Sequence, residues 1–213
     1  MKVVLLGATG FVGSAILKEA LDRRHHVTAV VRKQGQLSPT QELKIQITDV
    51  YDSVALAAVI VGHDALISAF NPGWKDPNLY ADQVRGTTSI LKAIKAASVK
   101  RGLWVGGAGG LLVKPGVRVI DAPDFPAPIK PGSLATIEAL VQLRREPSLD
   151  WSYLSPPANL RSGARTGKFR LGDDQLLKDS SGHSSISVQD YAVAMINELE
   201  YPAHIRERFT VGY

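Results

Sequence analysis

The chain has 213 residues, 45% of them hydrophobic, with 25 lysines and arginines against 20 aspartates and glutamates and no cysteine. This length and composition indicate one soluble domain over residues 1–213, and the absence of a signal-peptide pattern or an apolar run near the ~18 residues that span a bilayer favours a cytoplasmic protein with no membrane partner. The lack of cysteine excludes disulfides and thiolate metal sites, so we expect no metal, and the scattered positive charge without interleaved aromatic residues indicates no nucleic-acid partner.

The first feature along the chain is a glycine triplet between an apolar run and an amphipathic run. Residues 2–6 are apolar enough for a buried strand, and residues 12–24 place their apolar side chains on one helical face. Glycines where a strand turns into a helix let the backbone approach a pyrophosphate, which the helix N-terminus stabilises. The sequence therefore predicts a dinucleotide-binding turn whose contacts are Gly7, Thr9, Gly10, Phe11 and Val12.

The rest of the chain alternates strands and helices, which is typical of a doubly wound parallel sheet, the Rossmann fold. We expect about seven strands, at residues 2–6, 26–31, 43–47, 65–70, 103–105, 151–154 and 209–211. Ser133 is expected to cap the helix that runs to Arg145, and Ser187 with Asp190 forms a capping box for the last helix. Residues 111–132 and 158–186 are expected to be substrate-side segments, the second as a small C-terminal insertion.

Ligands of such sheets lie outside the carboxyl ends of the strands. The second strand ends in Arg32 and Lys33, where an arginine can bind a 2′-phosphate, so NADP(H) is favoured over NAD(H), although a solvated surface arginine is the other interpretation. Asp49 either accepts from the adenine amine or only caps a turn. The remaining expected cofactor contacts follow the third, fourth, fifth and sixth strands: Asp49 and Val50; Ser68, Ala69 and Phe70; Gly106, Gly107 and Ala108; and Pro156, Pro157 and Ala158.

The chain offers no obvious internal acid. No tyrosine is followed four residues later by a lysine, the pair with which short-chain reductases move a proton beside a carbonyl. The catalytic residues stay unassigned, with Tyr153, Ser155 and His183 as candidates. Four basic residues either receive an anionic substrate tail or form a solvated face: Arg161, Arg165, Lys168 and Arg170.

Several motifs together resemble one family over nearly the whole chain. The segments are residues 7–13, 106–109, 149–151, 155–156, 165–168, 186–192 and 208–213. They look like the bacterial NADH-flavin reductase-like proteins of the NAD(P)H-binding, NmrA-like group of atypical short-chain dehydrogenase/reductases. In such proteins the second glycine lies closest to the pyrophosphate, which assigns that place to Gly10. Gly110 stands where the family pattern has a serine, which argues against a catalytic hydroxyl there.

The resemblance implies an oxidoreductase that transfers hydride from NAD(P)H to a flavin, a quinone or a similar conjugated acceptor. A flavin is then a candidate substrate, the partner is a small-molecule acceptor, and the protein is expected to be a monomer or a homodimer. Two alternatives remain: a non-catalytic NADP-sensing regulator of the NmrA type, and an enzyme like the nucleotide-sugar epimerases, which would need the missing tyrosine-lysine pair and a larger substrate domain.

Overall fold

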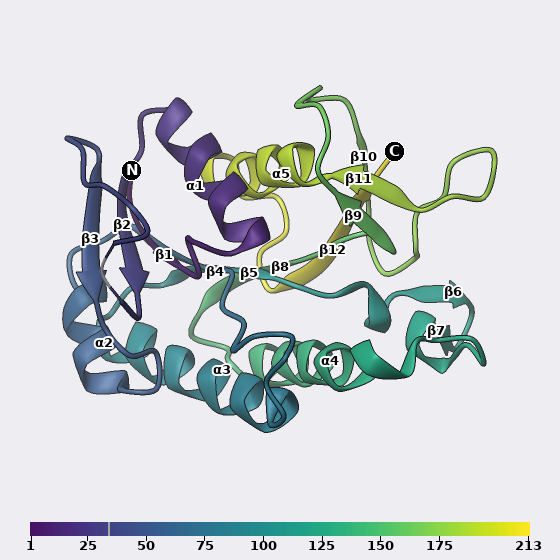
Figure 1. The fold of residues 1–213 in the computed structure, drawn as a ribbon, viewed down its shortest axis with the longest axis horizontal. Helices are drawn as coiled ribbons and strands as arrows, with labels where there is room; N and C mark the ends of the chain where they lie inside the picture. The colour runs from purple at the N-terminus through teal and green to yellow at the C-terminus, as the bar shows by residue number, and fades with distance from the viewer. Residues whose placement is uncertain (34) are drawn as a thin grey trace.

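The computed structural model describes residues 1–33 and 35–213, which form a three-layer α/β structure around a central sheet (Figure 1). The sheet has eight strands in the order β10-β12-β8-β5-β4-β1-β2-β3. Seven of them are parallel, and β10 pairs antiparallel to β12 at one edge. The strands are β1 (Lys2–Leu6), β2 (His26–Val31), β3 (Leu43–Ile47), β4 (Ala65–Ser68), β5 (Arg101–Val105), β8 (Asp150–Ser155), β10 (Arg170–Gly172) and β12 (Glu207–Gly212).

Helices cover both faces of the sheet, and each face has its own apolar core. Helices α1 (Phe11–Asp22) and α5 (Val188–Glu200) lie on one face; α2 (Ser53–Ile60), α3 (Leu79–Ala96) and α4 (Lys130–Arg144) lie on the other (Figure 1). Alternate residues of β1 point to opposite faces, so that Val3 and Leu5 join the core under α1 and α5 while Val4 and Leu6 join the other. A strand that is buried on both sides must be apolar throughout, which is why the strands of this sheet appear in the sequence as short continuous apolar runs.

The expected doubly wound parallel sheet is confirmed, and β10 adds an eighth strand to it. The cap at Ser187 is also confirmed, because its Oγ accepts from the backbone N of Asp190 at 3.0 Å. The cap at Ser133 is wrong, because α4 begins three residues earlier, at Lys130. Pro131 lies in the first turn of α4, where the missing N–H of proline leaves no helical hydrogen bond unmade.

The two segments expected on the substrate side, residues 111–132 and 158–186, lie at one end of the molecule, one beside α4 and the other beside α5 (Figure 1). The first contains the hairpin of β6 (Leu112–Lys114) and β7 (Val117–Arg118) with 3₁₀ turns at Val119–Asp121 and Ala127–Ile129, and a further 3₁₀ turn at Ala108–Gly110 precedes it. The second contains β9 (Asn159–Arg161), which pairs with β11 (Ser185–Ser187). Backbone hydrogen bonds from Leu112 N to Asp174 O (2.8 Å) and from Leu176 N to Leu112 O (2.9 Å) join the two segments.

The carboxylate of Asp190 fastens the second segment to α5. It is fully buried and accepts from Thr166 N, Gly167 N, Thr166 Oγ1 and Tyr213 Oη at 2.6–2.8 Å. Burial acts to raise the pKa of Asp190, but these hydrogen bonds outweigh it and hold the pKa below its ordinary value. The Asp190 carboxylate thus accepts from residues 166–167 and not from the backbone N–H of Ser187. Only one half of the expected capping box therefore forms, the hydrogen bond from Asp190 N to Ser187 Oγ.

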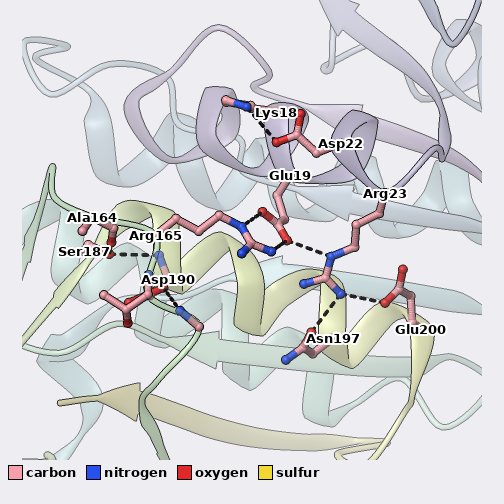
Figure 2. A network of polar contacts seen from close by, with 12 residues as sticks. Lys18, Glu19, Asp22, Arg23, Ala164, Arg165, Ser187, Asp190, Asn197 and Glu200 are labelled. Carbon is pink, nitrogen blue, oxygen red and sulfur yellow. Dashed lines mark hydrogen bonds and ion pairs between the residues drawn. The ribbon is translucent and has the colours of Figure 1, made fainter.

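A second anchor joins the same segment to α1 through a buried glutamate (Figure 2). Glu19 is 3% exposed and accepts two hydrogen bonds of 2.7 Å from Arg165 and a third of 2.7 Å from Arg23. Arg23 in turn donates to Glu200 (2.7 Å) and Asn197 (2.9 Å) of α5. The hydrogen bonds from Arg165 lower the pKa of Glu19 further than burial raises it, so the carboxylate is ionised at neutral pH. One buried charge therefore holds α1, α5 and the substrate-side segment together.

We expect Glu19→Gln to lower the free energy of unfolding by about 1–3 kcal/mol near neutral pH, because charge-assisted hydrogen bonds are lost. The control is Asp22→Asn, which breaks the exposed Lys18–Asp22 ion pair on the same helix and should change the free energy of unfolding by less than about 1 kcal/mol. Since the folded pKa of Glu19 is depressed, its contribution is present above the ordinary value of 4.5 and is lost as the pH falls through the folded pKa. Urea unfolding at stepwise lower pH measures this; a difference between wild type and Glu19→Gln that grows in acid contradicts it.

Candidate functional site

The turn between β1 and α1 shows a different role for each of its three glycines. Gly7 has φ +76°, and a Cβ there would lie 2.2 Å from the carbonyl oxygen of Ala69. A Cβ at Gly13 would lie 2.0 Å from the carbonyl oxygen of Gly7. A Cβ at Gly10, by contrast, would meet only Gly7 O, at 3.4 Å. Gly7 and Gly13 are required by the protein's own backbone, while the surface of Gly10 is left free for a ligand.

The amides after Gly10 are suited to an anion. The first hydrogen bond of α1 runs from Ser14 N to Gly10 O at 2.8 Å, so the amides of residues 11–13 precede the helical ladder. No side chain caps this helix end. Free N–H groups and the positive end of the helix dipole together favour a phosphate group. The residues present therefore fit the pyrophosphate of a dinucleotide.

A cleft of ≈ 800 Å³ continues from this turn along the carboxyl ends of the strands. It passes between the turn, the ends of β4 and β5, and the residues after β8. The structure thus brings to one cleft eleven of the expected cofactor contacts: Gly10, Phe11, Val12, Ala69, Phe70, Gly106, Gly107, Ala108, Pro156, Pro157 and Ala158.

Three other expected contacts lie around the turn but outside the lining of the cleft. Gly7 shapes the turn from within, Thr9 is exposed on it, and Ser68 is buried at the end of β4. Ser68 lies beside Leu6 in the pairing of β4 with β1. Gly7 and Ser68 therefore belong to the backbone that positions the turn, and they do not line the cleft.

The expected adenosine-side contacts lie at the ends of β2 and β3. Arg32 and Lys33 are exposed directly after β2. Asp49 is exposed, and its Oδ1 accepts from Tyr51 N at 2.9 Å, which is the turn-capping interpretation of this residue. Val50 is buried, and its carbonyl accepts from Ser89 Oγ at 2.6 Å. This edge carries two unshielded positive charges beside the parallel strand ends.

The three catalytic candidates are not brought together. Tyr153 is buried, and its phenol donates to Thr136 O at 2.7 Å; burial raises its pKa to about 12. Ser155 is fully buried at the end of β8. His183 lies in the loop before β11 with its side chain 77% exposed, 3.8 Å from Asp179. None of the three lines the cleft, and Tyr153 holds its proton too tightly for acid catalysis at neutral pH.

The glycines after β5 make room for protein side chains. A Cβ at Gly106 would lie 2.3 Å from the ring of Tyr153, and one at Gly107 would lie 2.4 Å from Thr136 Oγ1. The missing side chain of Gly106 therefore makes room for Tyr153, which does not line the cleft, and that of Gly107 makes room for Thr136, which does. The space of the missing side chains is thus filled by the protein itself, and the two glycines line the cleft with their backbone.

The far part of the cleft is an apolar wall that sequence reasoning did not assign. It is formed by Trp74 and by Phe125, Pro126 and Ile129 from residues 111–132. The Trp74 ring packs on Gly132 of α4, where a Cβ would lie 2.7 Å from Cζ3. The proline-rich composition of residues 111–132 indicated an irregular segment, but nothing in it indicated that these side chains meet Trp74.

Gln83 is another missed residue of the cleft. It lies on α3 and is 9% exposed, and its Nε2 donates to Phe70 O at 3.2 Å. Its Oε1 is buried and has no hydrogen-bond partner in the part of the chain that the structure describes. A buried acceptor without a partner is unfavourable, so this amide is suited to a donor on a ligand. The sequence did carry one signal for Gln83, because a polar residue on the buried face of an amphipathic helix needs a polar partner.

Two members of the basic set are already engaged. Arg165 is bound to Glu19, and Arg170 donates to the backbone oxygens of Lys178 and Tyr213. Arg161 and Lys168 are exposed. The set therefore acts in part to hold the substrate-side segment in place.

Within residues 1–33 and 35–213 no group of three or more histidine, aspartate or glutamate side chains is placed to hold a metal ion. None of the helices in those same ranges is long and apolar enough to cross a membrane.

Comparison with known proteins agrees with this geometry. Residues 7–202 match the model of a family described as NAD(P)H-binding. The chain belongs to this NAD(P)H-binding family. The match begins at the first glycine of the turn and includes every strand end that lines the cleft.

Similar members of the family come from several bacteria. The Bacillus subtilis (strain 168) protein YwnB is 39% identical over 99% of this chain and 98% of its own length. A Bacteroides thetaiotaomicron protein proposed to be an epimerase is 46% identical, with a TM-score of 0.93 over 100% of this chain and 96% of that one. A Streptococcus pneumoniae protein proposed to be an NADH-flavin reductase is 32% identical, with a TM-score of 0.88 over 100% of this chain and 99% of that one. The chain therefore has the NAD(P)H-binding fold of oxidoreductases.

We expect Gly10→Val to abolish NADPH binding while the protein stays folded, because the new side chain enters the cleft and meets little of the protein itself. The matched variant Gly13→Val should instead lose stability by more than about 3 kcal/mol, since its side chain collides with the backbone of Gly7. Calorimetric titration and thermal unfolding measure the two effects. A folded Gly10→Val protein with wild-type affinity for NADPH shows that the cofactor does not lie on this turn.

Proposed function

We propose that this protein is an NADPH-dependent reductase that transfers hydride to a flavin, a quinone or a similar conjugated acceptor. The observation that carries the proposal is the cleft itself. It runs without interruption from the glycine turn to the wall of Trp74, Phe125, Pro126 and Ile129. Among residues 1–33 and 35–213, Asp124 is the one charged residue that lines it, and Trp74, Phe125, Pro126 and Ile129 offer apolar surface for a flat ring.

In this proposal the protein contributes binding and position. The amides of residues 11–13 would hold the pyrophosphate, and the backbone after β4 and β5, which lines the cleft, would hold the ribose and the nicotinamide. When bound, the reduced nicotinamide supplies the hydride. Pro156, Pro157 and Ala158 close one side, and the apolar wall orients the acceptor and excludes water. Solvent then supplies the proton, since none of Tyr153, Ser155 and His183 lines the cleft.

Arg32 and Lys33 support the preference for NADPH. They stand where NAD-preferring proteins place an acid on the ribose hydroxyls. Both are exposed, and a guanidinium binds a phosphate with two parallel hydrogen bonds.

Turnover separates this proposal from its alternatives. NADPH oxidation is measured with FMN, riboflavin and a panel of quinones; no turnover with any of them, despite NADPH binding, would favour an NADP-sensing regulator. An epimerase function, as proposed for the Bacteroides thetaiotaomicron relative, has less support because the tyrosine-lysine pair is missing and Tyr153 is buried behind the wall of the cleft.

We expect Arg32→Ala to weaken NADPH binding by roughly 10- to 100-fold and to leave NADH binding nearly unchanged, because one charge-assisted hydrogen bond contributes ~1.5–3 kcal/mol. Arg145→Ala removes an exposed arginine at the end of α4 and should affect neither cofactor. Titration of both cofactors against both variants measures the difference. Equal losses for NADPH and NADH would show that Arg32 does not bind the 2′-phosphate.

The mechanism predicts small effects at the polar candidates. Tyr153→Phe, Ser155→Ala and His183→Gln should each lower kcat less than the ~100-fold minimum for loss of a positioned general acid. Ala108→Leu should lower it more, because Ala108 lines the cleft and a larger side chain would block stacking of the acceptor on the nicotinamide. The four variants are compared at saturating NADPH and FMN. A loss beyond ~100-fold at one polar residue, with Ala108→Leu harmless, points to acid-assisted reduction instead.

A further inference from the structure

A second cavity, of ≈ 370 Å³, lies behind the wall of the cleft, between α4, the hairpin of β6 and β7, and the start of β12. Arginines from three elements line it: Arg118 of β7, Arg144 of α4 and Arg208 of β12. Asp174 is the one acidic residue of its lining. We refer to it as the arginine-lined cavity. Its positive charge has no part in the function proposed above.

Two of these guanidinium groups are held in fixed positions. Arg208 has its side chain 8% exposed; it pairs with Asp174 and donates to Gly110 O at 2.8 Å. Arg118 donates to Asp121 from Nε at 2.9 Å and from Nη2 at 2.8 Å. A guanidinium has five N–H donors, so these contacts orient both groups and leave donors for a ligand.

Arg144 differs from the other two. It is the last residue of α4, where the negative end of the helix dipole stabilises a cation. It forms no ion pair with any carboxylate of residues 1–33 and 35–213. Arg144, Arg208 and the Tyr153 phenol all line the cavity. Arg144 therefore supplies the uncompensated charge.

Part of the cavity lining is apolar. It is formed by Leu112 of the hairpin and by Ile137, Leu140 and Val141 of α4. Such a surface stabilises a hydrocarbon group by removing it from water, but it does not stabilise a fully hydrated ion. Asp174 repels a second negative charge, so a monoanion fits better than a dianion.

We propose that the arginine-lined cavity is a second ligand site, which binds an organic monocarboxylate with a compact apolar body. The carboxylate lies among the three guanidinium groups, and the apolar body lies against α4. Arginine suits this role because its planar group binds a carboxylate with paired hydrogen bonds.

Calorimetric titration of the whole protein tests the proposal with four probes: 4-phenylbutyrate, its uncharged amide, acetate and inorganic phosphate. We expect 4-phenylbutyrate to bind at least about tenfold more tightly than each of the others, because each of them lacks the charge or the apolar body or is doubly charged. Arg144→Gln should weaken its binding at least about tenfold. Arg145→Gln, the same charge change one residue further on and outside the cavity, is the control and should bind like wild type.

The same titration is repeated with saturating NADPH, and binding of 4-phenylbutyrate should persist. Loss of binding under NADPH would place the carboxylate in the cleft and overturn the proposal. Equal affinity for the acid and its amide, equal affinity for phosphate, or equal losses in Arg144→Gln and Arg145→Gln would overturn it as well. None of these results depends on turnover, so they are separate from the test of the reductase function.

Discussion

The close crossing of the backbone at the first turn is the constraint on which the candidate site depends. A side chain at Gly13 would lie 2.0 Å from Gly7 O, and one at Gly7 would lie 2.2 Å from Ala69 O. Three chain segments, the ends of β1 and β4 and the start of α1, therefore meet at a distance that only glycine allows. Since β1 pairs with β2 on one side and β4 on the other, this crossing lies where the strand order reverses, and it presents the helix N-terminus to the cleft.

The substrate side is held by a different kind of interaction. Residues 162–169 contain no strand, and two buried carboxylates replace the backbone pairing that a sheet would provide. The Asp190 carboxylate accepts hydrogen bonds from the amides of residues 166–167, and the Glu19 carboxylate accepts them from the guanidinium of Arg165. Buried carboxylates are stable only when fully hydrogen-bonded, so each of these contacts also fixes the geometry of its partners. Arg165, which the sequence analysis considered for binding an anionic substrate tail, thus serves as a structural ion-pair partner.

The sequence predicts well those features that are local. The parallel strands are continuous apolar runs, and the glycine turn has a spacing that few other structures require. The strand β10 was expected only as part of a small insertion, because three residues at a sheet edge carry little pattern. Gln83 and Trp74 were missed because their places in the cleft depend on α3 and α4 meeting residues far away along the chain. The glycines after β5 were expected as cofactor contacts, and nothing in the sequence indicated that their missing side chains leave room for Tyr153 and Thr136.

The position of Gly107 has a consequence for both cavities. This residue lines the cleft on one side and the arginine-lined cavity on the other, so a single stretch of backbone separates two spaces of unequal size. Any coupling between the occupants of the two spaces would pass through this backbone, and thermodynamic linkage would make it equal in both directions. Carboxylate binding that persists under NADPH requires this partition to stay in place when either space is filled, so the rigidity of Gly107 decides whether the two spaces act independently.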